Sequence, residues 1–341
     1  MTAGPQTVKP SEDFEYYGST IYWNNFKAVQ VLHNQAMTGR GDVGWMAHLG
    51  SAYGPFDHAF FVNCGNGWVE RDLFNAGIIR RATGSDISPD LLAQARDGAA
   101  EIGLPATYLE ADVNTFEPEA GAYDLVVNVG AMHHVAYIDR MTRRLARMLR
   151  AGGVYASFDY VGAHRNQYSW EMWSRIIALN ESLPPSFRVK LEYPHLKSML
   201  HFDPSEAVHS ELQTEVMLRY FDVEQHVPLG GALAYTLLYE NRGLHRAQDE
   251  PEARALIAGI LEEDQAFLRS RPQDNLFSFW IAKPKAVPAN PALMSRWENE
   301  ERLREEDARH NGGRYYPPTA LELIYDEQAV LRQRLTVPAA S

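Results

Sequence analysis

The sequence has a single cysteine, no long apolar run and no concentration of positive charge. One cysteine excludes an intramolecular disulfide framework. No stretch is apolar over the roughly 18 residues that a membrane-spanning helix needs, and no signal-peptide pattern is present. The formal net charge of -12 at pH 7 repels nucleic-acid phosphates. We therefore expect a cytoplasmic protein with neither a nucleic-acid nor a membrane partner.

The length of 341 residues and the hydrophobic fraction of 45% suffice for a large core. Residues 1–55 are predicted to be a helical, aromatic segment, residues 56–285 the main domain, and residues 286–341 a charged helical extension. The extension could wrap the domain or project into solvent. Either terminal segment could also join a second copy into a homodimer.

A strand, a glycine turn and a helix organise the rest of the chain. The apolar run 59–62 predicts a buried strand, and Gly65-Asn66-Gly67 forms a turn that glycines make at low cost. A helix over 69–76 follows, ended by Gly77. This unit opens a doubly wound α/β sheet, in which ligands bind where such turns open.

The residues after the turn distinguish two cofactor classes. A dinucleotide site needs a third small residue where this chain has Glu70, which disfavours NAD. A cofactor without a pyrophosphate, such as S-adenosylmethionine (SAM), needs only the first two glycines. Asp86 ends the next predicted strand, 21 residues after Gly65, where a carboxylate can accept hydrogen bonds from both ribose hydroxyls.

Further strands alternate with helices, which predicts a mostly parallel sheet. We expect these strands over 80–86, 106–109, 123–130 and 154–160. Asp112, just past the third strand, could accept from an adenine amino group, and Val113 could supply a backbone contact. The arginines of the helix over 138–149 are expected on its solvated face: Arg140, Arg143, Arg144 and Arg147.

Residues 59–160 resemble the core of class I SAM-dependent methyltransferases. The matching stretches are 62–67, 84–88, 110–112, 123–127 and 149–153. The resemblance implies a seven-stranded, mostly parallel sheet with SAM bound by the glycine turn, Asp86 and Asp112. Two positions depart from the family pattern: Asn63 stands where an acidic residue is frequent, and Val69 replaces a third glycine.

The predicted cofactor contacts gather around these stretches. They are Asn63, Cys64, Gly65, Asn66, Gly67, Trp68, Asp86, Ile87, Asp112, Val113 and Asn128. Tyr22 and Trp23 could cover the cofactor and place aromatic faces near its sulfonium. The alternative for that segment is an ordinary amphipathic helix packed on the core.

The candidate catalytic residues follow the fourth and fifth strands. Those considered as a base are His133, His134, Asp159, Tyr160 and His164. The histidine pair could remove a proton near neutral pH or only shape the pocket. Arg165 could clamp a carboxylate or phosphate, or be a surface residue. Histidine spacing after residue 190 does not fit a ligand motif on one helix, so no metal is expected.

After residue 160, extra residues separate the fifth strand from the last strands that the family core predicts. We expect an insertion over 163–204 to act as a substrate lid. Helices are predicted over 170–183, 205–220, 251–269, 291–309 and 318–334, and strands over 222–227, 233–239 and 276–282.

These features favour methyl transfer to an oxygen, nitrogen or carbon atom of a small-molecule acceptor. A second possibility is transfer or cyclisation of the aminocarboxypropyl arm of SAM, which releases methylthioadenosine. A third is a protein that binds SAM without turnover. Reduction with NAD is the most distant alternative, because of Glu70.

Replacing Asp86 by alanine tests the predicted ribose contact. We expect Asp86→Ala to weaken SAM binding by about 1.5–3 kcal/mol, the scale of hydrogen bonds to a charged group. Calorimetric titration of the folded variant measures this difference. Unchanged affinity would remove Asp86 from the binding site.

Overall fold

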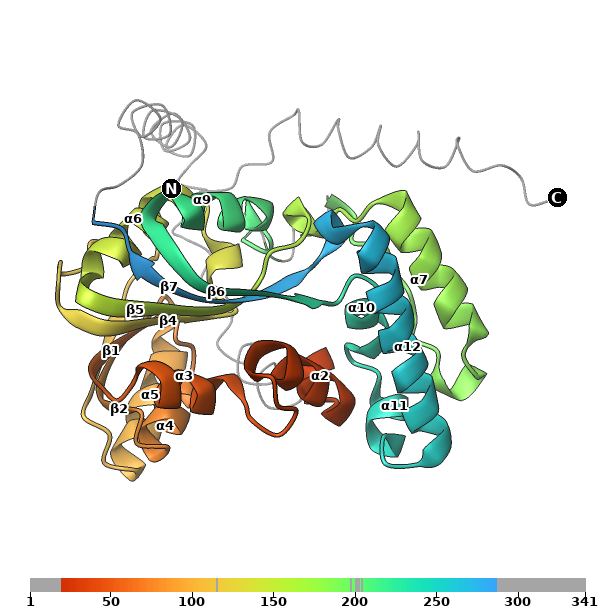
Figure 1. Ribbon diagram of the computed structural model, residues 1–341, viewed down its shortest axis with the longest axis horizontal. Helices are drawn as coiled ribbons and strands as arrows, with labels where there is room; N and C mark the ends of the chain where they lie inside the picture. The colour runs from red at the N-terminus through yellow and green to blue at the C-terminus, as the bar shows by residue number, and fades with distance from the viewer. Residues whose placement is uncertain (1–19, 115, 197, 200–202, 204, 287–341) are drawn as a thin grey trace, which may run out of the picture.

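The computed structural model describes residues 20–114, 116–196, 198–199, 203 and 205–286, which fold around one seven-stranded sheet (Figure 1). The strand order is β3-β2-β1-β4-β5-β7-β6. The strands are β1 (Phe56–Val62), β2 (Ile79–Asp86), β3 (Ala106–Glu110), β4 (Tyr123–Val129), β5 (Leu149–Tyr160), β6 (Phe221–Gly230) and β7 (Phe277–Pro284). Only β7 runs antiparallel to its neighbours, β5 and β6. The predicted fold class is confirmed.

Side chains alternate between the two faces of the sheet, as the period of two in a strand requires. In β1, Ala59 and Phe61 enter one core, whereas Phe60 and Val62 enter the other. Both faces are covered, so the central strands are apolar on both sides.

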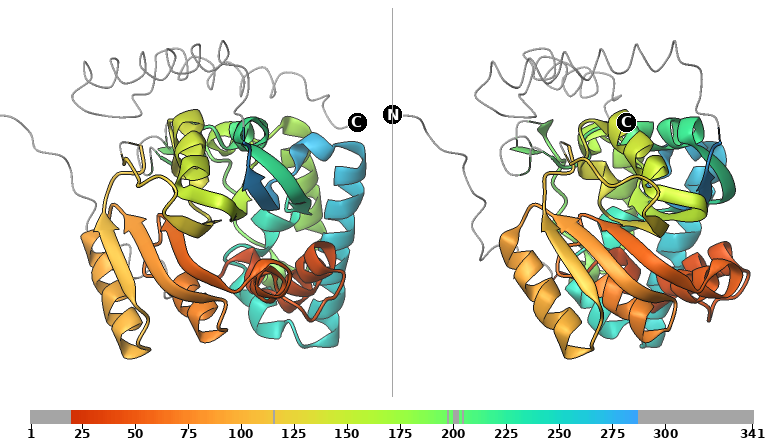
Figure 2. Two further views of the ribbon diagram at one scale, coloured as in Figure 1. Left: turned by 60° about the vertical axis from the view of Figure 1, so that its left-hand side comes forward. Right: turned by 90° about the vertical axis from the view of Figure 1, so that its left-hand side faces the viewer.

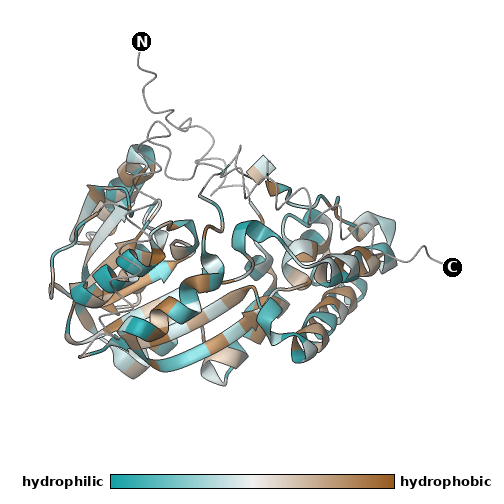
Figure 3. Ribbon diagram, turned by 90° about the horizontal axis from the view of Figure 1, so that it is seen from above, coloured by the Kyte–Doolittle hydropathy of each residue, from teal (hydrophilic) through white to brown (hydrophobic). Residues whose placement is uncertain are grey.

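Helices cover both faces of the sheet (Figures 1 and 2). One face packs against α3 (Trp45–Tyr53), α4 (Trp68–Asn75) and α5 (Pro89–Glu101), and the other packs against α6 (Ile138–Met148) and α9 (Gln213–Tyr220). Ser88 caps α5 by accepting from the Leu91 N–H, and Pro89 begins the helix, as the sequence indicates. In Figure 3 the helices carry both hydrophilic and hydrophobic residues, as expected for helices with one packed face.

A separate helical core lies beside the end of the sheet formed by β6 and β7 (Figure 1). Its helices are α2 (Lys27–Thr38), α7 (Trp170–Ser182), α10 (Ala234–Leu238), α11 (Arg242–Ala247) and α12 (Pro251–Ser270). Short 3-10 turns lie at Trp23–Asn25, Met132–His134, His164–Asn166, Pro185–Phe187, Ser210–Leu212 and Pro272–Asp274.

Trp23 belongs to this helical core, which corrects its predicted cofactor contact. Its side chain is 2% exposed and packs against His33 and Phe277. Tyr22 is half-buried, with its ring edge against Tyr239. Because burying the large ring of Trp23 is strongly favourable, this side chain stays in the core and does not cover the cofactor. The described part of this segment, from residue 20, is therefore packed on the core, as the alternative interpretation holds.

Three other local predictions are wrong. Residues 233–239 form helix α10 and not a strand, because the short apolar run packs against helices. The helix expected from Ser205 begins only at Gln213. Arg144 is buried: it pairs with Glu117 and donates to the Asn114 carbonyl.

The helices predicted over 291–309 and 318–334 lie outside the described residues. The three-part domain division and the homodimer stay predictions. Among the described residues, no helix combines the length and apolar character that crossing a membrane requires.

The buried Asp264 carboxylate of α12 holds the turn that leads into α10. It accepts from the backbone N–H groups of Gly231, Leu233 and Ala234 at 2.6–3.0 Å. We expect Asp264→Ala to lower the free energy of unfolding by about 3 kcal/mol or more, because three buried donors lose their acceptor. Urea denaturation measures this loss, and the exposed Glu262→Ala on the same helix is the matched control. Equal stability of the two variants would contradict the capping role.

Candidate functional site

The loop after β1 adopts a conformation that depends on its glycines. Gly65 and Gly67 have φ angles of +56° and +73°, in the left-handed region that glycine favours. A Cβ added at Gly67 would lie 2.9 Å from the Tyr108 hydroxyl oxygen. Substitution at Gly67 would therefore both strain the backbone and crowd the strand beneath.

Asp86 fixes this loop from the end of β2. Its Oδ2 accepts from the Gly65 N–H at 2.8 Å, and its Oδ1 accepts from the Ser88 N–H at 2.9 Å. Trp68, which follows Gly67 in the sequence, and Ile87, which follows Asp86, are 41% and 67% exposed. The cradle of left-handed glycines beside a strand-end carboxylate fits a nucleoside cofactor.

Asp112 lies beyond the end of β3 and is half-buried. Its Oδ1 accepts from the backbone and side-chain amides of Asn114, at 2.8 and 3.1 Å. Asn114, which sequence reasoning missed, in turn accepts from the Ala136 N–H and so links this loop to the loop after β4. Val113 is buried in the core, so only its backbone remains a predicted cofactor contact.

Glu70 is fully buried behind the glycine loop, near Cys64. Neither of its carboxyl oxygens has a hydrogen-bond partner among the described residues. Burial raises the pKa of Glu70 to about 8. Burial, with Glu70 and Asp86 nearby, also raises the pKa of the Cys64 thiol, which makes this cysteine a poor nucleophile.

Asn128 is a buried connector between β4 and β5, which differs from its predicted contact with the cofactor. Its amide donates to Ser157 Oγ and Asp159 Oδ2, both at 2.8 Å. Its carbonyl oxygen accepts from the N–H groups of Ala131 and Met132. The side chain is fully committed to the protein, so it positions the loop that carries the histidine pair.

His133, His134 and Glu206 meet at the carboxyl ends of β4 and β5. His133 Nδ1 donates to Asp159 Oδ1 at 2.6 Å. The Nε2 atoms of His133 and His134 lie 3.6 and 3.9 Å from Glu206 Oε2. Sequence reasoning missed Glu206, which is more than 70 residues from the pair; its position in the polar segment before α9 was the only signal.

The electrostatics of this cluster are dominated by the two carboxylates. Burial lowers the pKa of His133, but Asp159 and Glu206 outweigh it and raise the pKa well above the ordinary value. For Glu206, burial is outweighed by His133, which lowers the pKa to about 2. Burial and then the charge of His133 lower the pKa of His134.

The other predicted catalytic residues have different surroundings. Tyr160 is buried, its hydroxyl donates to the Ala163 carbonyl at 3.2 Å, and burial raises its pKa. The His164 ring stacks on that of His209. Arg165 is 2% exposed and donates to the Glu206 carbonyl, so it is a buried support and not a surface residue.

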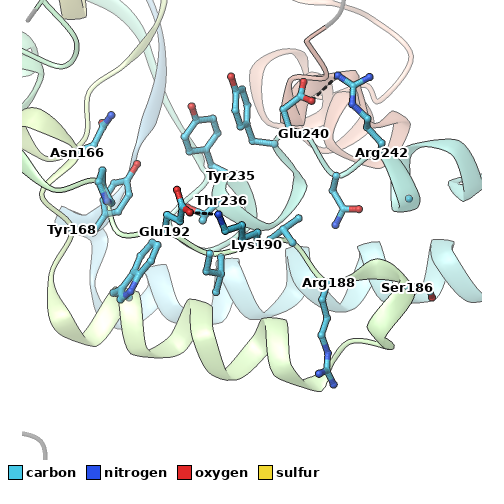
Figure 4. Close-up of a pocket in the computed structure, with 17 residues that line it drawn as sticks. Asn166, Tyr168, Ser186, Arg188, Lys190, Glu192, Tyr235, Thr236, Glu240 and Arg242 are labelled. Carbon is cyan, nitrogen blue, oxygen red and sulfur yellow. Dashed lines mark hydrogen bonds and ion pairs between the residues drawn. The ribbon is translucent and has the colours of Figure 1, made fainter. Parts of the chain in front are cut away.

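A cavity of about 620 Å³ lies between α7, the segment after it and α10 (Figure 4). Tyr168, Trp173 and Tyr235 give it aromatic walls. Asn166, also in its lining, donates from Nδ2 to Glu206 Oε1 at 3.2 Å. The cavity therefore borders the histidine cluster through Asn166, and part of the predicted lid insertion forms its wall.

A model of the methyltransferase domain family matches residues 61–153. This stretch contains the glycine loop, Asp86 and the histidine pair. Residues 61–153 therefore carry a methyltransferase domain. The cradle around Gly65 and Asp86 agrees with SAM, the cofactor expected for such a domain.

The methyltransferase domain is similar to curated relatives over part of their length. It is 32% identical over 133 residues to the biotin biosynthesis bifunctional protein of Bordetella avium, covering 39% of this chain and 26% of that protein. It is 31% identical over 93 residues to the ubiquinone biosynthesis O-methyltransferase of Nitrosococcus oceani, covering 27% of this chain and 39% of that protein. The chain thus spans less than half the length of these relatives.

Solved structures include similar chains at low identity. The phosphoethanolamine N-methyltransferase 2 of Haemonchus contortus, in complex with SAM, is 18% identical. The match covers 83% of this chain and 62% of that chain, with a TM-score of 0.46.

The buried Glu70 predicts a pH-dependent stability. Its folded pKa of about 8 exceeds the ordinary 4.5, so the group costs nothing below pH 4.5 and lowers the free energy of unfolding as pH rises toward 8. Glu70→Gln removes that cost. We expect its stability relative to wild type to increase by roughly 3 kcal/mol between about pH 5.5 and about pH 8.5.

Urea denaturation at the two pH values measures this change. The exposed Glu101→Gln controls for the loss of one carboxylate. A stability difference for Glu70→Gln that is the same at both pH values would show that Glu70 is not neutral in the folded protein.

Proposed function

We propose that this protein transfers the methyl group of SAM to an oxygen, nitrogen or carbon atom of a small-molecule acceptor. The observation that carries the proposal is the adjacency of two sites. The loop after β4, next to the glycine loop of β1, carries His133 and His134, and Glu206 connects this pair through Asn166 to a cavity of about 620 Å³. Such a volume suits a small ligand.

In this proposal each part of the site has one task. The glycine loop and Asp86 bind the nucleoside, and bound SAM supplies an electrophilic methyl group. The cavity orients the acceptor so that its reacting atom meets that methyl group in line. His133 and His134 lie beside the cavity, to which Glu206 and Asn166 connect them.

The lining of the cavity favours an acceptor with an aromatic or apolar body. Tyr168, Trp173 and Tyr235 offer ring surfaces. Two positive charges in the lining are already paired, since Lys190 pairs with Glu192 and Arg242 with Glu240 (Figure 4). The net charge of -12 supports the part of the proposal that excludes nucleic acid as the acceptor.

Calorimetric titration with SAM, S-adenosylhomocysteine, methylthioadenosine and NAD tests the cofactor first. We expect SAM and S-adenosylhomocysteine to bind and NAD not to bind, because Glu70 stands where a pyrophosphate turn needs a small residue. Mass spectrometry of SAM incubated with the protein and a panel of aromatic acceptors then identifies the products. S-adenosylhomocysteine together with an acceptor heavier by one methylene group supports the proposal.

Three outcomes would contradict the proposal. Methylthioadenosine above a control without protein would indicate reaction of the aminocarboxypropyl arm. SAM binding without product across the panel would favour a binding protein. Failure to bind any adenosyl ligand would return the glycine loop to a purely structural role.

A further inference from the structure

We propose that His133, His134 and Glu206 form a binding site for one divalent transition-metal ion such as Zn²⁺. One ligand atom from each residue lies within 4.8 Å of the other two. Two histidines and one carboxylate are a ligand set that binds Zn²⁺ and Fe²⁺ in proteins and leaves positions open for a substrate. The set comes from two distant segments, so no spacing in the sequence reveals it.

The distances between the ligand atoms suit a shared ion. An ion about 2.1 Å from each ligand in tetrahedral geometry places the ligand atoms about 3.4 Å apart. Glu206 Oε2 lies 3.6 Å from His133 Nε2 and 3.9 Å from His134 Nε2. A contraction of a few tenths of an ångström would complete the coordination. All three side chains are partly exposed, at 13%, 30% and 30%, so an ion can reach them.

Hydrogen bonds behind the cluster orient His133 as a ligand. Its Nδ1 donates to Asp159 Oδ1 at 2.6 Å, which leaves Nε2 directed at Glu206. Asp159 is itself held by Asn128 and by the Met132 N–H. Histidines that bind a metal usually donate from their other ring nitrogen to a carboxylate in this way. The hydrogen bond fixes the tautomer and the orientation of the ring.

His134 has an equivalent support. The Ser205 hydroxyl donates to Asp203 Oδ1 at 2.7 Å, so its oxygen accepts from His134 Nδ1 at 3.0 Å. The proton of a neutral His134 ring is then on Nδ1, and the Nε2 lone pair faces Glu206. Asn166 binds the other carboxylate oxygen of Glu206 and leaves Oε2 toward the histidines.

A second cluster of similar composition lacks this arrangement. His164, His209 and Glu211 also place ligand atoms within 4.8 Å of one another. The nitrogen of His164 that faces Glu211, Nδ1, instead accepts from the His209 N–H at 3.4 Å. This cluster therefore supplies a matched control for the proposed site.

The ion would act on the acceptor at the border of the cavity. Its open positions would take an oxygen of the acceptor and lower the pKa of a bound hydroxyl. That role rests on the proposed methyl transfer, whereas metal binding itself does not.

Metal titration of the full-length chain, purified without a histidine tag and stripped with a chelator, tests the site. We expect one equivalent of Co²⁺ to bind with visible d–d absorption, and Zn²⁺ to displace it. Glu206→Ala and His134→Ala each remove a ligand, so binding should weaken more than tenfold. Asp159→Asn acts through His133 and should weaken binding about 10- to 100-fold. His164→Ala should bind Co²⁺ like wild type.

Circular dichroism of each variant establishes that it is folded, and Glu206→Ala, at a half-buried position, is the variant best able to tolerate its change. Absence of saturable binding at one equivalent would overturn the proposal. So would a loss of binding in His164→Ala that matches the loss in Glu206→Ala. Because no step requires SAM, failure here is distinct from failure of the proposed methyl transfer.

Discussion

The buried carboxylate of Asp159 is the interaction on which the site depends. It accepts from His133, from the amide of Asn128 and from two backbone N–H groups, those of Met132 and Tyr160. A charge buried this deeply is tolerated only when such donors surround it. The same bonds join β5 to the loop after β4, so the histidine pair is held by the sheet itself and not by a free loop.

A second buried carboxylate, that of Asp86, holds the glycine loop in a similar way. Asp86 ends β2, which is the neighbour of β1 in the sheet. Asp86 accepts from Gly65 and Ser88, and thereby joins the ends of β1 and β2. Behind this loop the buried Glu70 is costly, because the pKa near 8 reflects a carboxyl group that burial keeps neutral. Proteins often keep such a destabilising residue at a functional site, and Glu70 lies directly behind the predicted cofactor loop.

The helical core beside β6 and β7 forms most of the cavity that borders the histidine pair. Its helices come from the segment before β1, from the insertion after β5 and from the connection between β6 and β7. Trp23 fills the interior of this core, while Tyr168 and Tyr235 line the cavity. The glycine loop thus belongs to the sheet, and the cavity proposed for the acceptor belongs largely to the added helices.

The sequence by itself determined the sheet, the cofactor loop and the positions of Asp86 and His133, because their signals are local. A few consecutive residues are enough to recognise an alternating strand, a glycine turn or a carboxylate at the end of a strand. Parallel strands then bring their carboxyl ends to the same edge of the sheet. Only the tertiary structure decided the partners of those residues. Glu206 reaches the histidine pair across more than 70 residues. Arg144 and Trp23 became buried, and 233–239 became a helix, because packing against distant elements outweighed local preference.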